Sequence, residues 1–231
     1  MERVNGKCYL VGAGPGDPGL LTVKGKECLS VADVLVYDAL SSPEFLRMVP
    51  KDCEKIYAGK RASDHAIPQG GINELIVEKA REGKTVVRLK GGDPMIFGRG
   101  GEEAAELAEA EVPFEIVPGI SSAIGGAAYA GIPVTHRDHC SQLTLFTGHE
   151  DPSKEQTSLD YAKLAEADGT RVFLMGVSRL RKITSALIEH GADPAIPMAL
   201  TRWATTGRQC TIEGTLGSMA DIAEKEHFKS P

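Results

Sequence analysis

One stretch, residues 89–103, reads LKGGDPMIFGRGGEE and decides how the fold of this chain is interpreted. It holds five glycines within eleven residues, between the apolar run Thr85–Leu89 and the helical pattern Glu102–Ala110. A simple turn does not need that length. Loops at the carboxyl ends of parallel strands are where open α/β sheets bind ligands. We therefore predict a ligand-binding loop between a buried strand and a helix.

Segments typical of buried strands alternate with helical patterns on both sides of this stretch. Strand, helix and strand in this rhythm indicate βαβ units and a parallel sheet. The strands predicted before Pro118 are Lys7–Val11, Val34–Tyr37, Thr85–Leu89 and Phe114–Val117, and the helices are Thr22–Ala32, Ile72–Glu82 and Glu102–Ala110.

A second set of predicted strands and helices follows Pro118–Gly119. We therefore predict an α/β protein of two lobes, residues 1–117 and 118–231, with the glycine loops in the first. The strands predicted in the second lobe are Gln142–Thr147, Thr170–Met175, Pro197–Trp203 and Gln209–Glu213, and the helices are Tyr161–Ala167 and Arg179–His190.

The composition excludes several classes of protein. The 26 Lys and Arg against 32 Asp and Glu leave a net charge of −6, and aromatic residues make up 5%, so neither the charge nor stacking surfaces favour nucleic acid. The five cysteines are odd in number, widely spaced and without a CxxC pair, which indicates a reducing cytoplasm rather than disulfides or structural zinc. The uncharged stretch Val117–His136 contains several glycines and prolines, so we interpret it as loop, short helix and loop rather than as a membrane span.

A second glycine loop, Gly12-Ala13-Gly14-Pro15-Gly16-Asp17, follows the first predicted strand. Glycines there let the main chain approach a ligand, and the next helix offers free N–H groups. A nicotinamide-dependent dehydrogenase is an alternative, because Asp38 lies where an acidic residue holds a ribose. The spacing is GxGxG rather than GxGxxG, which disfavours it. A plain βα turn also stays open.

Two further motifs lie after residue 117. Ser121 and Ser122 stand at a helix start, where capping of the helix and contact with a ligand are about equally plausible. His136 and His139 suggest a metal, but no third ligand of suitable spacing is visible, so we expect no metal site.

Together these segments resemble the tetrapyrrole methylases, and within them the enzymes that methylate uroporphyrinogen III. The likeness covers nearly the whole chain, and the GGDPxxFGRGGEE pattern is its most specific part. The matching segments are YLVGAGPGDPGLLTVKG (9–25), ADVLVYDAL (32–40), GKR with a following His (59–65), VVRLKGGDPMIFGRGGEE (86–103), VPGISSA (117–123), YAGIPVTHR (129–137), LFTGH (145–149) and FLMGV (173–177).

The resemblance implies a fold, a reaction and an assembly. The expected fold is two α/β lobes with S-adenosylmethionine (SAM) in the cleft between them, as a cytoplasmic homodimer. The expected reaction moves two methyl groups to carbons 2 and 7 of uroporphyrinogen III, giving precorrin-2 and two S-adenosylhomocysteine (SAH), at the branch toward sirohaem and cobalamin. Another precorrin methylase is the alternative. No nucleic acid, membrane or metal is expected.

The resemblance also implies site residues. The substrate carries eight carboxylates, so local guanidinium groups must bind them. Arg99 and Arg137 are the main candidates, and Lys60 and Arg61 are further ones. After methylation a proton must leave the macrocycle, for which Asp38 is the expected acceptor and Lys60 the expected donor. Glu102 is expected to position a pyrrole N–H, or else to be a first-turn glutamate favoured by the helix dipole. The expected cofactor contacts are Pro15, Gly91, Gly92, Asp93, Ile96, Ser121, Ser122, Met175 and Ala204, and the expected substrate contacts are Arg99, Glu102 and Arg137.

This chain departs from the family pattern at several positions. Ala39 stands where many members have Arg, Gly70 and Gly71 where many have Glu, and Ala204 where Gly is common. The family usually continues with another apolar strand after a Lys-Ser-Pro segment, so we expect the second lobe to lack it. A module that binds SAM without catalysis therefore stays open as a third reading.

Overall fold

The computed structural model describes residues 6–38, 43–59, 68–148 and 157–230. Contacts between residues divide the chain into two compact units, Met1–Gly125 and Gly126–Pro231. This division falls inside helix α4 (Ser122–Tyr129), later than the predicted change at residue 118.

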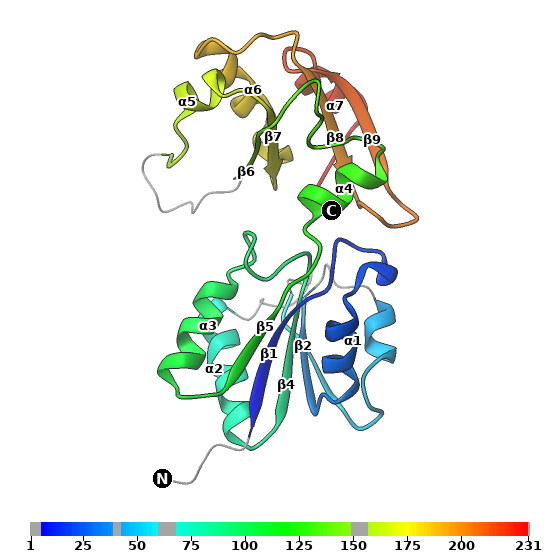
Figure 1. Ribbon diagram of the computed structural model, residues 1–231, viewed down its shortest axis with the longest axis vertical. Helices are drawn as coiled ribbons and strands as arrows, with labels where there is room; N and C mark the ends of the chain where they lie inside the picture. Colours follow the sequence, from blue (N-terminus) through cyan, green and yellow to red (C-terminus); the bar gives the residue numbers. More distant parts are fainter. Residues whose placement is uncertain (1–5, 39–42, 60–67, 149–156, 231) are drawn as a thin grey trace. The chain divides into compact units, whose positions relative to one another are not determined.

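The first unit is built on a parallel sheet of five strands in the order β3-β2-β4-β1-β5 (Figure 1). The predicted α/β class with a parallel sheet is confirmed. The central strands read as apolar runs because both of their faces are covered. The strands are β1 (Lys7–Gly12), β2 (Val34–Tyr37), β3 (Glu54–Tyr57), β4 (Thr85–Lys90) and β5 (Phe114–Val117).

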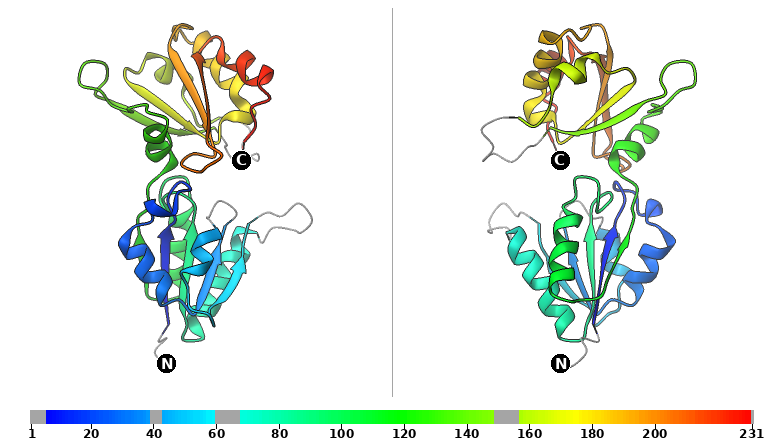
Figure 2. Two further views of the ribbon diagram at one scale, coloured as in Figure 1. Left: turned by 90° about the vertical axis from the view of Figure 1, so that its right-hand side faces the viewer. Right: turned by 60° about the vertical axis from the view of Figure 1, so that its left-hand side comes forward.

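Helices cover the two faces of this sheet. Helix α1 (Val23–Ser30) lies on one face, and α2 (Gln69–Arg81) and α3 (Gly100–Glu109) lie on the other (Figure 2). Side chains alternate along β4, so that Val87 and Leu89 join the core beneath α1 while Val86 joins the core beneath α2 and α3. Short 3-10 helices at Pro18–Leu20 and Pro43–Arg47 complete the unit.

Strands β1 and β4 are neighbours, but their connections leave toward opposite faces. The chain passes from β1 into α1 on one face and from β4 into α3 on the other. Such a point of divergence, at the carboxyl ends of parallel strands, is where open α/β sheets bind ligands. Both glycine loops found in the sequence follow these two strands.

The second unit contains two strand pairs. β6 (Leu143–Thr147) pairs with β7 (Thr170–Leu174) in parallel, and β8 (Pro197–Arg202) pairs with β9 (Cys210–Thr215) antiparallel. Two apolar clusters hold these pairs to the helices. The helices are α5 (Tyr161–Glu166), α6 (Leu180–Glu189), preceded by the 3-10 turn Val177–Arg179, and α7 (Met219–Lys225).

Two elements escape the sequence patterns. β3 reads EKIY, and its first two residues are exposed because it is the sheet's edge strand, so it lacks an apolar run. Helix α7 was likewise not predicted from the sequence. Helix α2 begins at Gln69, three residues before the predicted start. Among the described helices, none has the length and apolarity needed to cross a membrane.

Candidate functional site

Three loops meet at the carboxyl edge of the first sheet, one after each of β1, β4 and β5. Gly14 and Gly92 exchange two main-chain hydrogen bonds, Gly14 N to Gly92 O at 3.1 Å and Gly92 N to Gly14 O at 2.8 Å. The Ala13 N–H donates to Lys90 O at 2.7 Å. The first two loops are therefore joined through their main chains.

The third loop crosses the first two so closely that side chains cannot fit. A Cβ added to Gly12 would lie 2.6 Å from the Gly119 Cα, and one added to Gly119 would lie 2.2 Å from the Gly92 oxygen. Real Cβ atoms essentially never approach main-chain atoms so closely. Glycine is required here because three main chains occupy the space of side chains.

Asp93 fastens the loop after β4 to the loop after β5. One of its carboxylate oxygens accepts a hydrogen bond from Gly119 N at 2.9 Å, and the other accepts one from Met95 N at 2.8 Å. The Gly100 N–H closes the same loop by donating to Pro94 O at 2.9 Å. Asp93 thus has a structural task that the sequence did not reveal, beside its expected cofactor contact.

Two contacts lie around α4, one of them at Ser121; contact of Ser121 and Ser122 with a ligand stays a prediction. Ser121 is buried, and its hydroxyl accepts a hydrogen bond from Ala123 N at 3.3 Å, so it acts as a local cap at the start of α4. Pro15 lies so near this helix that a Cβ on Gly125 would be 2.9 Å from the Pro15 Cγ. Ile96, in the loop after β4, is exposed.

Asp38 directly follows β2 at the same edge of the sheet. Its Oδ2 accepts a hydrogen bond from Nη2 of Arg88, in β4, at 3.0 Å, and its Oδ1 lies 2.8 Å from Arg88 Nη1 in an ion pair. Such a fork holds a carboxylate in one plane. The Asp38 side chain is partly exposed, at 29%, whereas Arg88 is buried.

Arg99 and Glu102, both expected to bind substrate, are paired with each other. Arg99 has a left-handed backbone, with φ at 59°, and precedes α3; its Nε and Nη2 donate to the Glu102 carboxylate at 2.9 and 2.6 Å. This hydrogen bond lowers the pKa of Glu102. Glu102 lies in the first turn of α3, as its helix-dipole interpretation predicts. Both side chains are more than half exposed, so the pair is weak and open to exchange with another carboxylate.

Three of the expected site residues belong to the second unit. Met175 follows β7 with a left-handed φ of 58°, and its side chain is exposed. Ala204 lies in the turn after β8, where its Cβ is 3.0 Å from the position a Cβ on Gly126 would take. Arg137 is exposed in a tight turn closed by a bridge between His136 and Cys140. Lys60 and Arg61 fall outside the described residues.

Sequence reasoning missed the buried charges beneath Asp38. Arg88 and Lys90 alternate within β4 and are 2% and 3% exposed, and Glu103 of α3 is fully buried between them. Two cations in an otherwise apolar strand were the available signal, because charged residues are almost never fully buried unless paired. Sequence reasoning also passed over Gly119 as a point of contact between loops.

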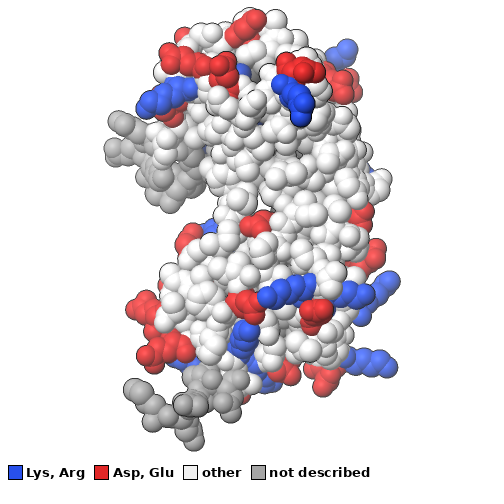
Figure 3. Space-filling model, viewed as in Figure 1, with Lys and Arg blue, Asp and Glu red and all other residues white. Residues whose placement is uncertain are grey.

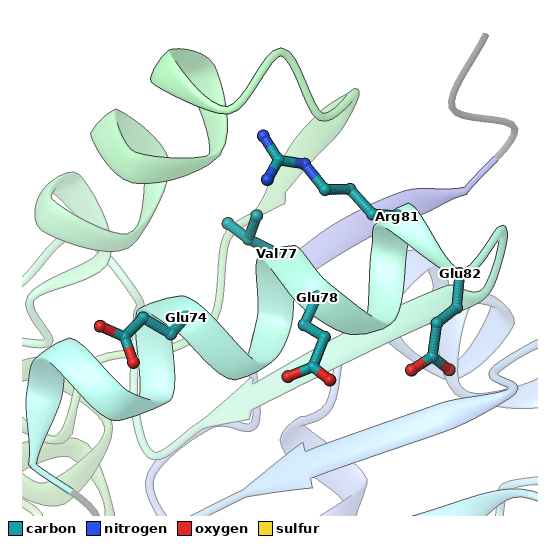
Figure 4. A pocket seen from close by; sticks show the side chains of 5 residues that line it. All are labelled: Glu74, Val77, Glu78, Arg81 and Glu82. Atoms are coloured by element: carbon teal, nitrogen blue, oxygen red, sulfur yellow. The ribbon is translucent and has the colours of Figure 1, made fainter. Parts of the chain in front are cut away.

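The rest of the described surface shows no comparable arrangement. Figure 3 shows acidic and basic side chains interspersed on the face in view. The pocket in Figure 4 lies on the outer side of α2, where Glu78 and Glu82 point away from Val77 and Arg81, which is typical of a solvated helix face. Among the described residues, no three His, Cys, Asp or Glu side chains gather as metal ligands would.

The fold and the site define an α/β protein whose glycine loops meet at the divergence of two parallel strands, which is where open α/β sheets bind ligands. The family model of the tetrapyrrole (corrin/porphyrin) methylases matches residues 7–220. The chain belongs to this family.

Individual relatives are similar along the whole chain. A Methanosarcina barkeri protein named S-adenosyl-L-methionine-dependent uroporphyrinogen III methyltransferase is 51% identical over 231 residues, which is 100% of this chain and 91% of the relative. A Bacillus subtilis uroporphyrinogen-III C-methyltransferase is 48% identical over 100% of this chain, but the chain spans only 48% of that protein. The solved uroporphyrin-III C-methyl transferase of Thermus thermophilus complexed with S-adenyl homocysteine is 38% identical, with a TM-score of 0.82, over 98% of this chain and 94% of that one.

Proposed function

We propose that this protein is a SAM-dependent C-methyltransferase that converts uroporphyrinogen III to precorrin-2 by methylating carbons 2 and 7, releasing two SAH. The observation that carries the proposal is the meeting of three loops where β1 and β4 diverge. The loops after β1 and β4 are joined by main-chain hydrogen bonds, and Gly119 of the loop after β5 packs closely against both. It is supported by relatives named for this reaction, one of which was solved with SAH.

The first unit offers what a charged, polar methyl donor needs. Main-chain groups can bind a cofactor without adding charge, and the Gly12–Gly92–Gly119 crossing keeps side chains out of the space beside them. SAM supplies a methyl group on a positively charged sulfur, which is already strongly electrophilic, so the protein's task is to align the reactants and exclude water. We assign the cofactor contacts to Pro15, Gly91, Gly92, Asp93, Ile96, Ser121, Ser122, Met175 and Ala204.

Arg99, Glu102 and Arg137 are assigned to the substrate. In a protein of net charge −6, a polycarboxylate must be bound by local cations. Arg99 has a planar fork already set on the Glu102 carboxylate, and both are exposed, so a substrate carboxylate can take the place of Glu102 at little cost. Glu102, once released, is then free to accept a pyrrole N–H.

Asp38 is assigned as the proton acceptor and Lys60 as the proton donor. The hydrogen bond and the ion-pair contact with Arg88 leave further lone pairs on the Asp38 oxygens, and the partly exposed carboxylate lies at the edge where the three loops meet. We also propose that the protein acts in the cytoplasm as a homodimer and that its product feeds sirohaem or cobalamin synthesis.

The deciding experiment is anaerobic incubation of the protein with SAM and uroporphyrinogen III, with mass spectrometry of the tetrapyrrole. We expect a product heavier by two CH2 units, because a proton leaves for each methyl group added, and two SAH per substrate consumed. SAH binding without a methylated product would leave a module that only binds SAM. Methylation of a precorrin but not of uroporphyrinogen III would indicate another tetrapyrrole methylase, and binding of NAD in place of SAH would refute the proposal.

A further inference from the structure

Four charged side chains form one connected network behind the carboxyl edge of the first sheet. Arg88 and Lys90 come from β4 and Glu103 from α3, and all three are at most 3% exposed. Only Asp38, the fourth member, is partly exposed, at 29%. The network thus runs from the core to a single carboxylate at the surface.

Glu103 is the hub of this network. Its Oε1 accepts hydrogen bonds from Arg88 Nε at 3.0 Å, Lys90 Nζ at 2.8 Å and Gln69 Nε2 at 3.1 Å. Gln69 is the first residue of α2 and also donates to Asn73 Oδ1 at 3.0 Å. Donors from two elements, β4 and α2, therefore hold one carboxylate oxygen of α3.

Arg88 is held at both ends of its guanidinium group. Its Nε donates to Glu103, its Nη2 donates to Asp38, and its Nη1 lies in ion-pair contact with the other Asp38 oxygen. The plane of the group is thereby set by Glu103 in the core, and the plane of the Asp38 carboxylate is set by Arg88 in turn. Burial disfavours the Arg88 cation, but the two carboxylates outweigh burial and raise its pKa, so the fork stays charged.

The formal charges of the network sum to zero, with two cations and two carboxylates. Burying such ions is costly, and a well-packed apolar replacement is often as stable, so stability alone is a weak reason for the network. Burial, followed by repulsion from Arg88, lowers the pKa of Lys90, which is consistent with that cost.

We propose that Glu103 and Arg88 are positioning residues for methyl transfer. Glu103 orients Arg88, and Arg88 fixes the direction of the Asp38 carboxylate toward the macrocycle. This inference rests on the proposed function, and specifically on Asp38 as the proton acceptor. Neither residue was expected at the site from the sequence, and neither needs to touch substrate.

The main test is a double-mutant cycle on kcat with Arg88→Lys, Asp38→Asn and the combined variant. Lysine keeps the charge but lacks the fork, so Arg88→Lys is expected to lower kcat by about 10- to 100-fold, as small misplacements of reacting groups do. KM and SAH affinity are expected to stay within about twofold. In the Asp38→Asn background the same change is expected to cost less than about twofold, because its effect passes through Asp38.

The matched control is Arg181→Lys, which removes a fork on Asp221 and Glu224 at the exposed surface of the second unit. It is expected to leave kcat unchanged. A kcat loss of equal size in both Asp38 backgrounds would overturn the inference, since it would show a purely structural effect. An unchanged kcat in folded Arg88→Lys would overturn it as well.

A second variant tests the inference even if Arg88→Lys fails to fold, and its readout does not depend on enzyme turnover. Glu103→Met/Lys90→Met removes one charge of each sign together with the oxygen that accepts from Arg88 Nε, so Arg88 loses its orienting partner while the remaining Arg88–Asp38 pair stays neutral. In its crystal structure we expect the Asp38 carboxylate to rotate out of the guanidinium plane. Both Arg88–Asp38 contacts persisting at 2.8 and 3.0 Å would overturn the inference even if the wild-type protein proved to methylate a different substrate.

Discussion

Replacing Gly119 by alanine tests whether the crossing of three main chains builds the SAM site. The new Cβ would lie 2.2 Å from the Gly92 oxygen, 2.8 Å from the Gly12 Cα and 2.9 Å from the Gly12 carbonyl carbon. All three are main-chain atoms, so no side-chain rotation relieves the contact. Since non-bonded carbon contacts are optimal at about 3.5–4.0 Å, the loops must separate by roughly 1 Å.

The structure sets the size of the expected effect. Overpacking of this kind costs about 1–3 kcal/mol, which for a protein of this size lowers Tm by about 2–12 °C. If the loops relax apart in the free protein, SAH must pull them back together. A strain of about 1–3 kcal/mol then weakens SAH binding by roughly 5- to 150-fold.

The assay is calorimetric titration of SAH, beside urea unfolding followed by circular dichroism. Gly70→Ala is the matched control, because Gly70 lies in α2 with no atom within 4 Å of the added Cβ. It is expected to leave SAH affinity unchanged and to stabilise the protein by up to about 1 kcal/mol. Wild-type SAH affinity in a folded Gly119→Ala protein would refute the claim that this crossing shapes the site.

Three further predictions concern other parts of the chain. Arg137→Ala is expected to lower kcat/KM for uroporphyrinogen III by about 10- to 100-fold, the value of a charge-assisted hydrogen bond, with little change in SAM affinity by titration. Cys8 is fully buried, and burial raises the pKa of its thiol to about 12. The neutral thiol therefore stabilises the folded state fully below pH 9, near the pKa of the thiol in the unfolded chain, and this stabilisation is lost as pH rises toward 12. Urea unfolding should therefore show wild type losing about 1.4 kcal/mol more than Cys8→Val between about pH 8 and pH 10. Thr22→Ala removes the cap of α1, whose Oγ1 accepts from Gly25 N at 3.0 Å, and should cost about 0.5–2 kcal/mol in the same unfolding assay.

Each of these predictions has a result that contradicts it. Equal loss of turnover and SAM affinity in Arg137→Ala would remove its assignment to a substrate carboxylate. Parallel stability curves for wild type and Cys8→Val would show that the thiol does not ionise on unfolding. An unchanged free energy of unfolding in Thr22→Ala would mean that water replaces the cap at no cost.

The sequence alone predicted the class of fold and the loops of the site, because both depend on local chemistry. Apolar runs ending in glycine mark buried strands that feed loops, and β2 and β5 match their predicted bounds residue for residue. Residues 89–103 carry the pattern most specific to the family, and such a pattern of residue types can be recognised without knowledge of the fold. Arg99 and Glu102 lie three residues apart at a helix start, so their pairing too was within reach of the sequence.

Only the tertiary structure determines which of these segments come into contact. Strand order is set by crossover connections, and it places β4 beside β1, so that Gly92 hydrogen-bonds Gly14 across 78 residues of chain. Arg88, Glu103 and Asp38 are likewise brought together by the packing of α3 on β4 and of β4 on β2, which no local spacing encodes. A charge in a strand looks the same in the sequence whether it is solvated or buried, and the fold supplies the partners that distinguish the two.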